Sequence, residues 1–295
     1  MTDRQDSGSA SGITAMLGAG AIMYVGTAMA TTLFSVLGPA GVTLARQVVM
    51  LITHGSLALA RPVRPTGRQV LLSMGFGAAL ACMNLTFYLA IARIPLGTAV
   101  TLEFLGPIAV AVLGFRTRLA ALCSLVTALG VIGLARPTGT ADTTGILFAL
   151  AAAVAWAAYI HANQAVGKRL PGFTGSAIAA ATSVTLVLPF ALPGIVWSEV
   201  TWQVIGLAAL VGLLSSAIPY ALDTFSLRRL SAPLYASLLG SYPILATLSG
   251  VILLGDAIGL IEVVATVAIV AAGVTVVRAD RAGRRQGEEP TTPSD

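Results

Sequence analysis

The sequence predicts an all-α integral membrane protein with ten transmembrane helices, arranged as two inverted five-helix repeats. Three observations predict this fold. Only 10% of the 295 residues are charged and 56% are hydrophobic, whereas a soluble domain carries about 25% charged residues. A surface with so little charge must face lipid. Apolar runs of membrane length recur along the chain, and an ungapped internal repeat relates its two halves.

The predicted spans follow from the length of the apolar runs. A helix rises 1.5 Å per residue, so about 20 apolar residues cross about 30 Å of hydrocarbon. Breaks such as Gly38-Pro39, Pro171-Gly172 and Gly255-Asp256 separate the runs. The chain ends, residues 1–12 and 278–295, are predicted to be disordered. The predicted spans are 13–37, 40–60, 69–92, 96–115, 119–135, 144–165, 174–195, 203–226, 232–254 and 258–277.

The distribution of positive charge predicts the orientation. If the N-terminus is cytoplasmic, the inner loops and tail hold 13 arginines and lysines and the outer loops hold 2, leaving aside Arg4 and Arg46. Positive residues accumulate on the cytoplasmic side of membrane proteins. The sequence therefore predicts a multi-pass protein of the cytoplasmic membrane with both termini inside. Because the net charge of +5 is dispersed between apolar runs, no nucleic-acid partner is expected.

An internal repeat with a constant offset of 136 residues indicates two equivalent halves. The clearest matches are Arg93 with Arg229, Pro107 with Pro243, and Gly114 with Gly250. Each half, 13–135 and 144–277, holds five predicted spans, and an odd number inverts the second half relative to the first. Inverted repeats are typical of secondary transporters, which bind their substrate near the midplane between the halves.

Three segments resemble a known family. They are NLTFYLAIARIPLGTAVTLEFLGPIAVAVLG (84–114), VAWAAYIHANQ (154–164) and IPYALDTFSLRRLSAPLYASLLGSYPILATLSGVILLGD (218–256). They are similar to the drug/metabolite transporter superfamily with EamA-type repeats. The pieces LEFLGP (102–107) and VTLAR (42–46) resemble its threonine/homoserine exporter branch. The resemblance extends over about residues 13–277.

This resemblance implies ten helices in two inverted halves and export of small metabolites, often amino acids. It implies no cofactor and no ATP hydrolysis. The chain departs from the branch at Tyr242, where the branch usually has a glutamate before the proline of the ninth span. The departure removes an acid from the expected cavity.

Charged residues inside the predicted spans are the leading site candidates. A charge at a helix centre costs about 2.5–3.5 kcal/mol on insertion scales, and such residues usually face the bundle interior. Arg46 and Glu103 lie about six and seven residues into spans that start outside, which places both about 9–10 Å deep. They are predicted to handle substrate or protons; the alternative is a static ion pair that only locks the helices.

The remaining candidates are polar or aromatic residues within spans. Asp223 and His54 lie nearer the inner surface and are proton-coupling candidates together with Glu103. Snorkelling of Asp223 and an ordinary polar contact of His54 are the alternatives. Four aromatic residues are predicted to line the substrate cavity, with simple packing as the alternative: Trp156, Tyr159, Tyr220 and Tyr242.

The predicted function is secondary export of small polar metabolites, with amino acids or related zwitterions as the expected class. Arg46 is predicted to meet a carboxylate and Glu103 an ammonium group, with proton antiport as the driving force. Pro107 and Pro243 are the hinge candidates. The expected partners are the small-molecule substrate and the bilayer, and a homodimer is left open.

Two other classes of function remain as alternatives. A membrane-embedded enzyme needs a catalytic constellation, and the sequence holds neither a His/Glu metal cluster nor a Ser/Lys dyad. A non-transporting scaffold or receptor accounts for the helices, but not for an inverted repeat that carries charges inside the membrane.

Overall fold

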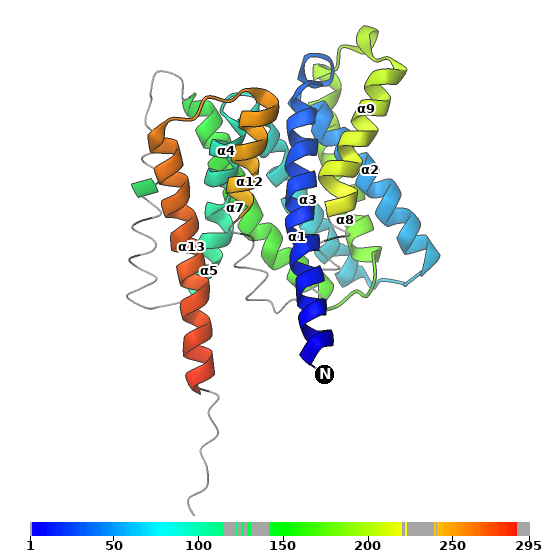
Figure 1. The fold of residues 1–295 in the computed structure, drawn as a ribbon. Coiled ribbons are helices and arrows are strands. Elements are labelled where there is room, and N and C mark those ends of the chain that lie inside the picture. Colours follow the sequence, from blue (N-terminus) through cyan, green and yellow to red (C-terminus); the bar gives the residue numbers. More distant parts are fainter. Residues whose placement is uncertain are drawn as a thin grey trace, which may run out of the picture.

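The computed structural model describes residues 2–114, 142–219 and 241–287, together with single positions at 122, 126, 129–130, 222 and 239. Regular structure in these residues is helical, and the helices stand side by side as a bundle (Figure 1). The elements are α1 (Thr2–Thr31), α2 (Phe34–Ala60), α3 (Gly67–Ile91), α4 (Leu96–Glu103), α5 (Leu105–Gly114), α7 (Thr143–Gly167), α8 (Thr174–Ala191), η1 (Leu192–Gly194), η2 (Trp197–Glu199), α9 (Trp202–Gly212), η3 (Leu213–Ala217), α12 (Tyr242–Ser249), η4 (Gly250–Leu254) and α13 (Leu260–Gly287).

Five of the described helices are long and apolar enough to cross a membrane. They confirm the first, second, third, sixth and seventh predicted spans as helices of membrane length. Shorter apolar helices cover parts of the fourth, eighth, ninth and tenth predicted spans. Nearly all of the fifth predicted span, 119–135, lies outside the described residues.

The predicted breaks and ends differ in how well they match the structure. Gly38, Gly172 and Gly255 all adopt positive φ angles of 66–73°, which glycine tolerates because it has no Cβ. These are three of the predicted breaks. Gly38 lies inside α2, where its non-helical angles kink the helix. At the chain ends, α1 begins at Thr2 and α13 continues to Gly287, so helix replaces the disorder predicted for 2–12 and 278–287. Adding a residue to an existing helix gains one hydrogen bond without a new nucleation cost.

The predicted fourth span is interrupted. Helix α4 ends at Glu103 and α5 begins at Leu105. Pro107 explains the interruption, because it has no N–H to donate to the carbonyl of Glu103 and its ring clashes with that carbonyl.

The helices pack closely where small residues face a neighbour. α3 packs against α7 and α8, and α2 packs against α8. A Cβ on Gly77 of α3 would collide with the backbone of Ala179 in α8, and a Cβ on Gly97 of α4 would collide with Thr247 of α12. Small residues at such contacts let helices approach closely within a bilayer.

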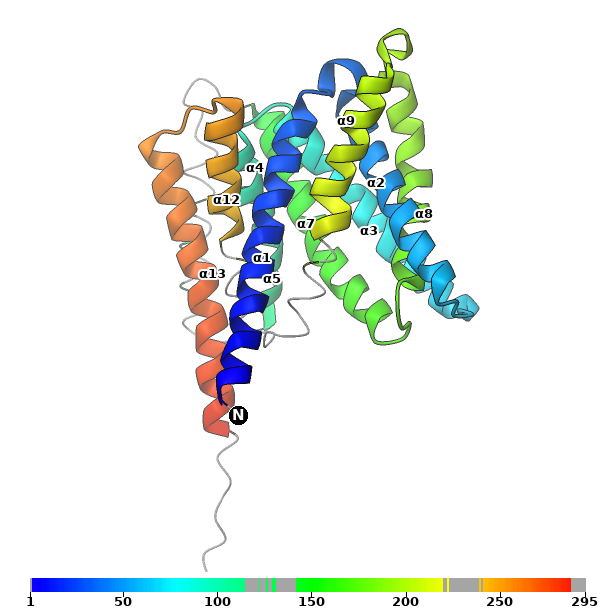
Figure 2. The same ribbon diagram turned by 45° about the vertical axis from the view of Figure 1, so that its right-hand side comes forward.

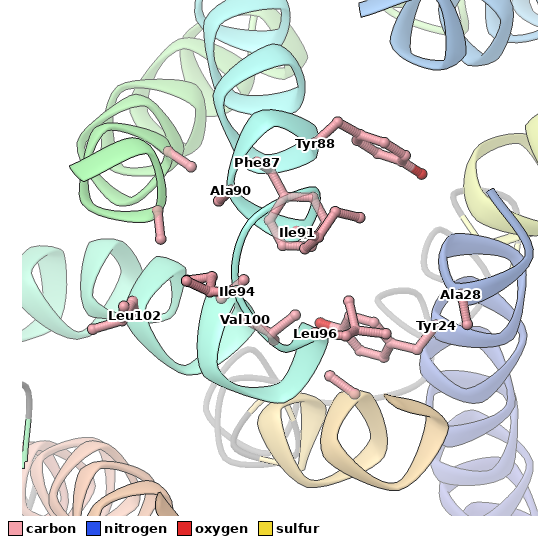
Figure 3. Packing of buried hydrophobic residues seen from close by; sticks show 14 of the residues in the cluster. Tyr24, Ala28, Phe87, Tyr88, Ala90, Ile91, Ile94, Leu96, Val100 and Leu102 are labelled. Carbon is pink, nitrogen blue, oxygen red and sulfur yellow. The ribbon is translucent and has the colours of Figure 1, made fainter. Parts of the chain in front are cut away.

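Helix α1 stands between two groups of helices. α12 and α13 lie on one side of it, and α2, α8 and α9 lie on the other (Figures 1 and 2). The start of α1 and the last turns of α13 lie at the same end of the bundle. The main hydrophobic core joins α1, α3, α4 and α7. Tyr24 and Tyr88 project into it from α1 and α3 (Figure 3).

Candidate functional site

Arg46 is a buried cation between three elements. Its side chain extends from α2 and is 6% exposed. Nη1 donates to Oδ1 of Asn84 in α3 at 3.0 Å, and Nη2 donates to the backbone carbonyl of Ser215 in η3 at 2.6 Å. The guanidinium carbon lies 4.8 Å from the centre of the Tyr88 ring, within the range of a cation–π interaction. Arg46 therefore links α2, α3 and η3.

Asn84 and Tyr88 come from one face of α3, because residues four apart stack on the same side of a helix. Asn84 donates from Nδ2 to the carbonyl of Leu80 at 2.9 Å, which turns its Oδ1 toward the guanidinium. Tyr88 is fully buried, and within the described residues its hydroxyl has no hydrogen-bond partner. This face of α3 thus orients the cation and presents a further polar group beside it.

The carbonyl of Ser215 is available to Arg46 for a reason that the sequence shows. In an α-helix this carbonyl would accept from the N–H of the residue four positions later. That residue is Pro219, which has no N–H. The helix also widens here into the π-helical segment η3, a form that occurs frequently at functional sites.

Glu103 lies at the end of α4 and is 8% exposed. Arg46 is near enough for the two opposite charges to attract each other. Neither residue forms an ion pair within 4.0 Å with another described residue. A direct ion pair is therefore not formed here, and Arg46 instead contacts neutral oxygen atoms.

The predicted aromatic and proton-coupling residues fall into separate groups. Tyr242 of α12 is buried and packs edge-on against Tyr24, with ring centres 5.7 Å apart. Trp156 of α7 packs against Phe104, the residue after Glu103, at 6.1 Å. Tyr159 packs on Phe76 in a second hydrophobic cluster.

His54 is buried in α2 and its ring lies 5.3 Å from that of Phe173, just before α8. Tyr220 and Asp223 lie outside the described residues. The predicted role of His54 and Asp223 in proton coupling therefore stays a prediction.

The two hinge candidates occupy similar places. Pro107 is the third residue of α5 and Pro243 is the second residue of α12. The helix that carries each proline starts directly after a turn residue, Phe104 or Ser241. Proline is tolerated in the first turn of a helix, where the N–H groups have no partner inside the helix.

A cavity of about 200 Å³ lies between α4, α12 and α13. Apolar side chains and the threonines 98, 247 and 266 line most of it. Asp256 at its edge accepts a hydrogen bond from the N–H of Leu96 at 3.0 Å and so caps the start of α4. Within the described residues, no group of three His, Cys, Asp or Glu side chains is placed to hold a metal ion.

Four polar groups of the site were missed by reasoning from the sequence. Gln47, Asn84, Tyr88 and Ser215 are all buried at the level of Arg46 or in contact with it. Two signals were present. Asn84 is a polar residue within an apolar run, which is unfavourable unless it finds a partner. Pro219 removes the helical partner of the Ser215 carbonyl.

Comparisons with known proteins agree on one family. A model of the EamA-like transporter family matches residues 143–278. The threonine/homoserine exporter RhtA of Escherichia coli (strain K12) is 34% identical over 270 residues, which cover 89% of this chain and 90% of that protein. RhtA of Salmonella typhimurium (strain LT2) is 34% identical over 257 residues, 84% of this chain and 85% of that protein.

A solved structure described only as a crystal structure of a protein has a TM-score of 0.59 to this chain at 21% identity. The match covers 95% of this chain and 99% of the other. At this identity the likeness shows the fold alone.

Proposed function

The chain belongs to the EamA-like transporter family, in the branch of the RhtA exporters, and we propose that it exports amino acids of the threonine and homoserine type across the cytoplasmic membrane. The main support is that the chain is 34% identical to such exporters over most of its length and also holds the buried cation Arg46 with neutral groups. A zwitterionic amino acid supplies the carboxylate that this cation lacks among the described residues.

The proposed architecture is the ten-helix inverted repeat, with one five-helix unit at 13–135 and the other at 144–277. The constant offset of 136 residues supports it. The charge asymmetry of the loops supports a cytoplasmic location of both termini. The start of α1 and the last turns of α13 lie at the same end of the bundle, which supports a common side for the two termini. Reporter fusions near Arg64 and at the C-terminus should both report the cytoplasm.

In the proposed binding mode the substrate lies between Arg46 and Glu103. Arg46 binds the carboxylate and Glu103 binds the ammonium group. Their burial, their opposite charges and the lack of an ion pair between them support a ligand that bridges them. Trp156, Tyr159, Tyr220 and Tyr242 are proposed to line the cavity, and Pro107 and Pro243 are proposed to act as hinges.

Proton antiport is the proposed driving force. Glu103 is the leading coupling residue, because a carboxyl group inside the membrane exists either neutral with a proton or charged with a cationic partner. Binding an ammonium group would then release the proton. Asp223 and His54 remain further candidates for the proton path.

Flux in proteoliposomes tests this function. Purified protein should exchange internal for external labelled L-threonine, and Arg46→Ala and Glu103→Gln should each lower the rate at least tenfold at equal protein levels. Arg93→Ala is the matched control, because it removes an exposed arginine that pairs with Asp142 instead; its flux should stay within about twofold of wild type, as expected for a surface pair.

The same assay separates the alternatives. A receptor or scaffold would bind threonine without exchanging it. Unchanged flux in both Arg46→Ala and Glu103→Gln would contradict the assignment of the site and leave these residues with a structural role.

A further inference from the structure

The hydrogen bond between Arg46 and Ser215 connects distant parts of the chain. It joins α2 to η3, 169 residues apart in sequence. Its acceptor is a backbone carbonyl that Pro219 deprives of the usual helical donor. Because Pro219 cannot donate to it, this carbonyl is available to accept from Arg46.

The guanidinium has a donor pair suited to an anion. Nη1 is engaged by Asn84 and Nη2 by Ser215, while Nε is buried and has no hydrogen-bond partner among the described residues. The N–H groups of Nε and Nη2 point outward from the same edge of the planar guanidinium and together form a fork that matches the two oxygens of a carboxylate. Among the described residues, the Ser215 carbonyl alone occupies part of that fork.

We propose that the carboxylate of the substrate displaces the Ser215 carbonyl from Arg46, so that substrate binding breaks the connection between α2 and η3. This inference rests on the proposed function, because it requires a substrate with a carboxylate. The exchange replaces one neutral acceptor by an ionised carboxylate that can take two parallel hydrogen bonds from the guanidinium, and such bidentate pairs add both energy and geometric specificity. Asn84 and Tyr88 keep the guanidinium on α3 during the exchange. Binding is thereby coupled to a movement of η3 relative to α2.

The first test needs no substrate. Pro219→Ala supplies an N–H to the Ser215 carbonyl, which competes with Arg46 for it. Pro189→Ala is the matched control, because Pro189 also lies within a helix, α8, but on its exposed side. Spin labels at Leu57 of α2 and Leu210 of α9, both exposed, report the distance in a background with Cys82 and Cys123 replaced by serine.

Pro219→Ala should shift or broaden the distance distribution by about 1–2 Å, the size of helix shifts at interfaces, and Pro189→Ala should leave it unchanged. Equal distributions in wild type and Pro219→Ala would overturn the proposal.

The second test adds ligands to the wild-type chain. L-Threonine should shift the distance in the same direction as Pro219→Ala, and L-threonine methyl ester, which lacks the free carboxylate, should not. Asn84→Asp places a carboxylate next to Nη1, so its affinity for L-threonine in calorimetry should fall about tenfold or more.

The outcomes separate the two proposals. L-Threonine that binds without changing the label distance would contradict the exchange and leave the proposed function standing. A chain that binds no L-threonine would contradict the proposed substrate, and the comparison of Pro219→Ala with Pro189→Ala would then decide the role of the connection by itself.

Discussion

Gly77 offers a direct test of how closely α3 and α8 approach each other. A Cβ at this position would lie 2.7 Å from Cβ of Thr182 and 2.9 Å from Cα of Ala179, and closer still to the Ala179 carbonyl. Ordinary contact with a Cβ begins at 3.4 Å. Two of these three atoms belong to the backbone, so no side-chain rotation can relieve the overlap. Gly77→Ala must therefore push α3 away from α8.

The expected cost follows from this geometry. Overpacking of a well-packed contact costs about 1–3 kcal/mol, and the higher helix propensity of alanine returns about 0.5–1 kcal/mol. The net loss relative to wild type is about 0–2.5 kcal/mol, which lowers the melting temperature by as much as about 10 °C at about 2–4 °C per kcal/mol for a large domain. Because α3 also carries Asn84 and Tyr88, threonine flux should fall as well.

The assay is thermal unfolding in one detergent, with Gly75→Ala as the matched control. Gly75 lies on the same helix, and a Cβ there would meet nothing within 4 Å, so its melting temperature should stay equal or rise. If Gly77→Ala proves as stable as Gly75→Ala, the inference that α3 and α8 touch too closely for a Cβ at position 77 is wrong.

Two further predictions concern the loops outside the helices. Asp256→Ala should cost about 1 kcal/mol of stability, because the N–H of Leu96 loses its cap, whereas Asp256→Asn, which keeps an oxygen acceptor, should recover most of the melting temperature; equal losses in both variants would exclude the capping role. The hydrogen bond from Arg93 lowers the pKa of the Asp142 carboxyl below its ordinary value. A lowered folded-state pKa gives stability that is present above the unfolded-state pKa, near 4, and is lost as the pH falls through the folded-state pKa. Unfolding scans from pH 6 to pH 3 should therefore show a small loss of stability in acid that Asp142→Asn lacks. An identical pH profile in the variant would contradict this prediction.

The sequence predicts much of the fold because membrane insertion depends on local composition. A run of about 20 apolar residues is sufficient to predict a span, and five such spans appear as helices of membrane length. Glycine at positions 38, 172 and 255 marks breaks that the structure confirms. The sequence also singled out Arg46 and Glu103 as charges inside the membrane, since any such charge is unfavourable in hydrocarbon.

Only the tertiary structure decided which groups those charges meet. The sequence left open whether Arg46 binds substrate or pairs with Glu103, and in the structure its hydrogen bonds go to Asn84 and to the carbonyl of Ser215. The rotation of each helix about its axis sets such contacts, and it depends on where small residues such as Gly77 let two helices approach. Depth in the bilayer is a property of one segment and can be read along the chain. The partner of a buried charge depends on how separate segments pack, and that is decided by the fold as a whole.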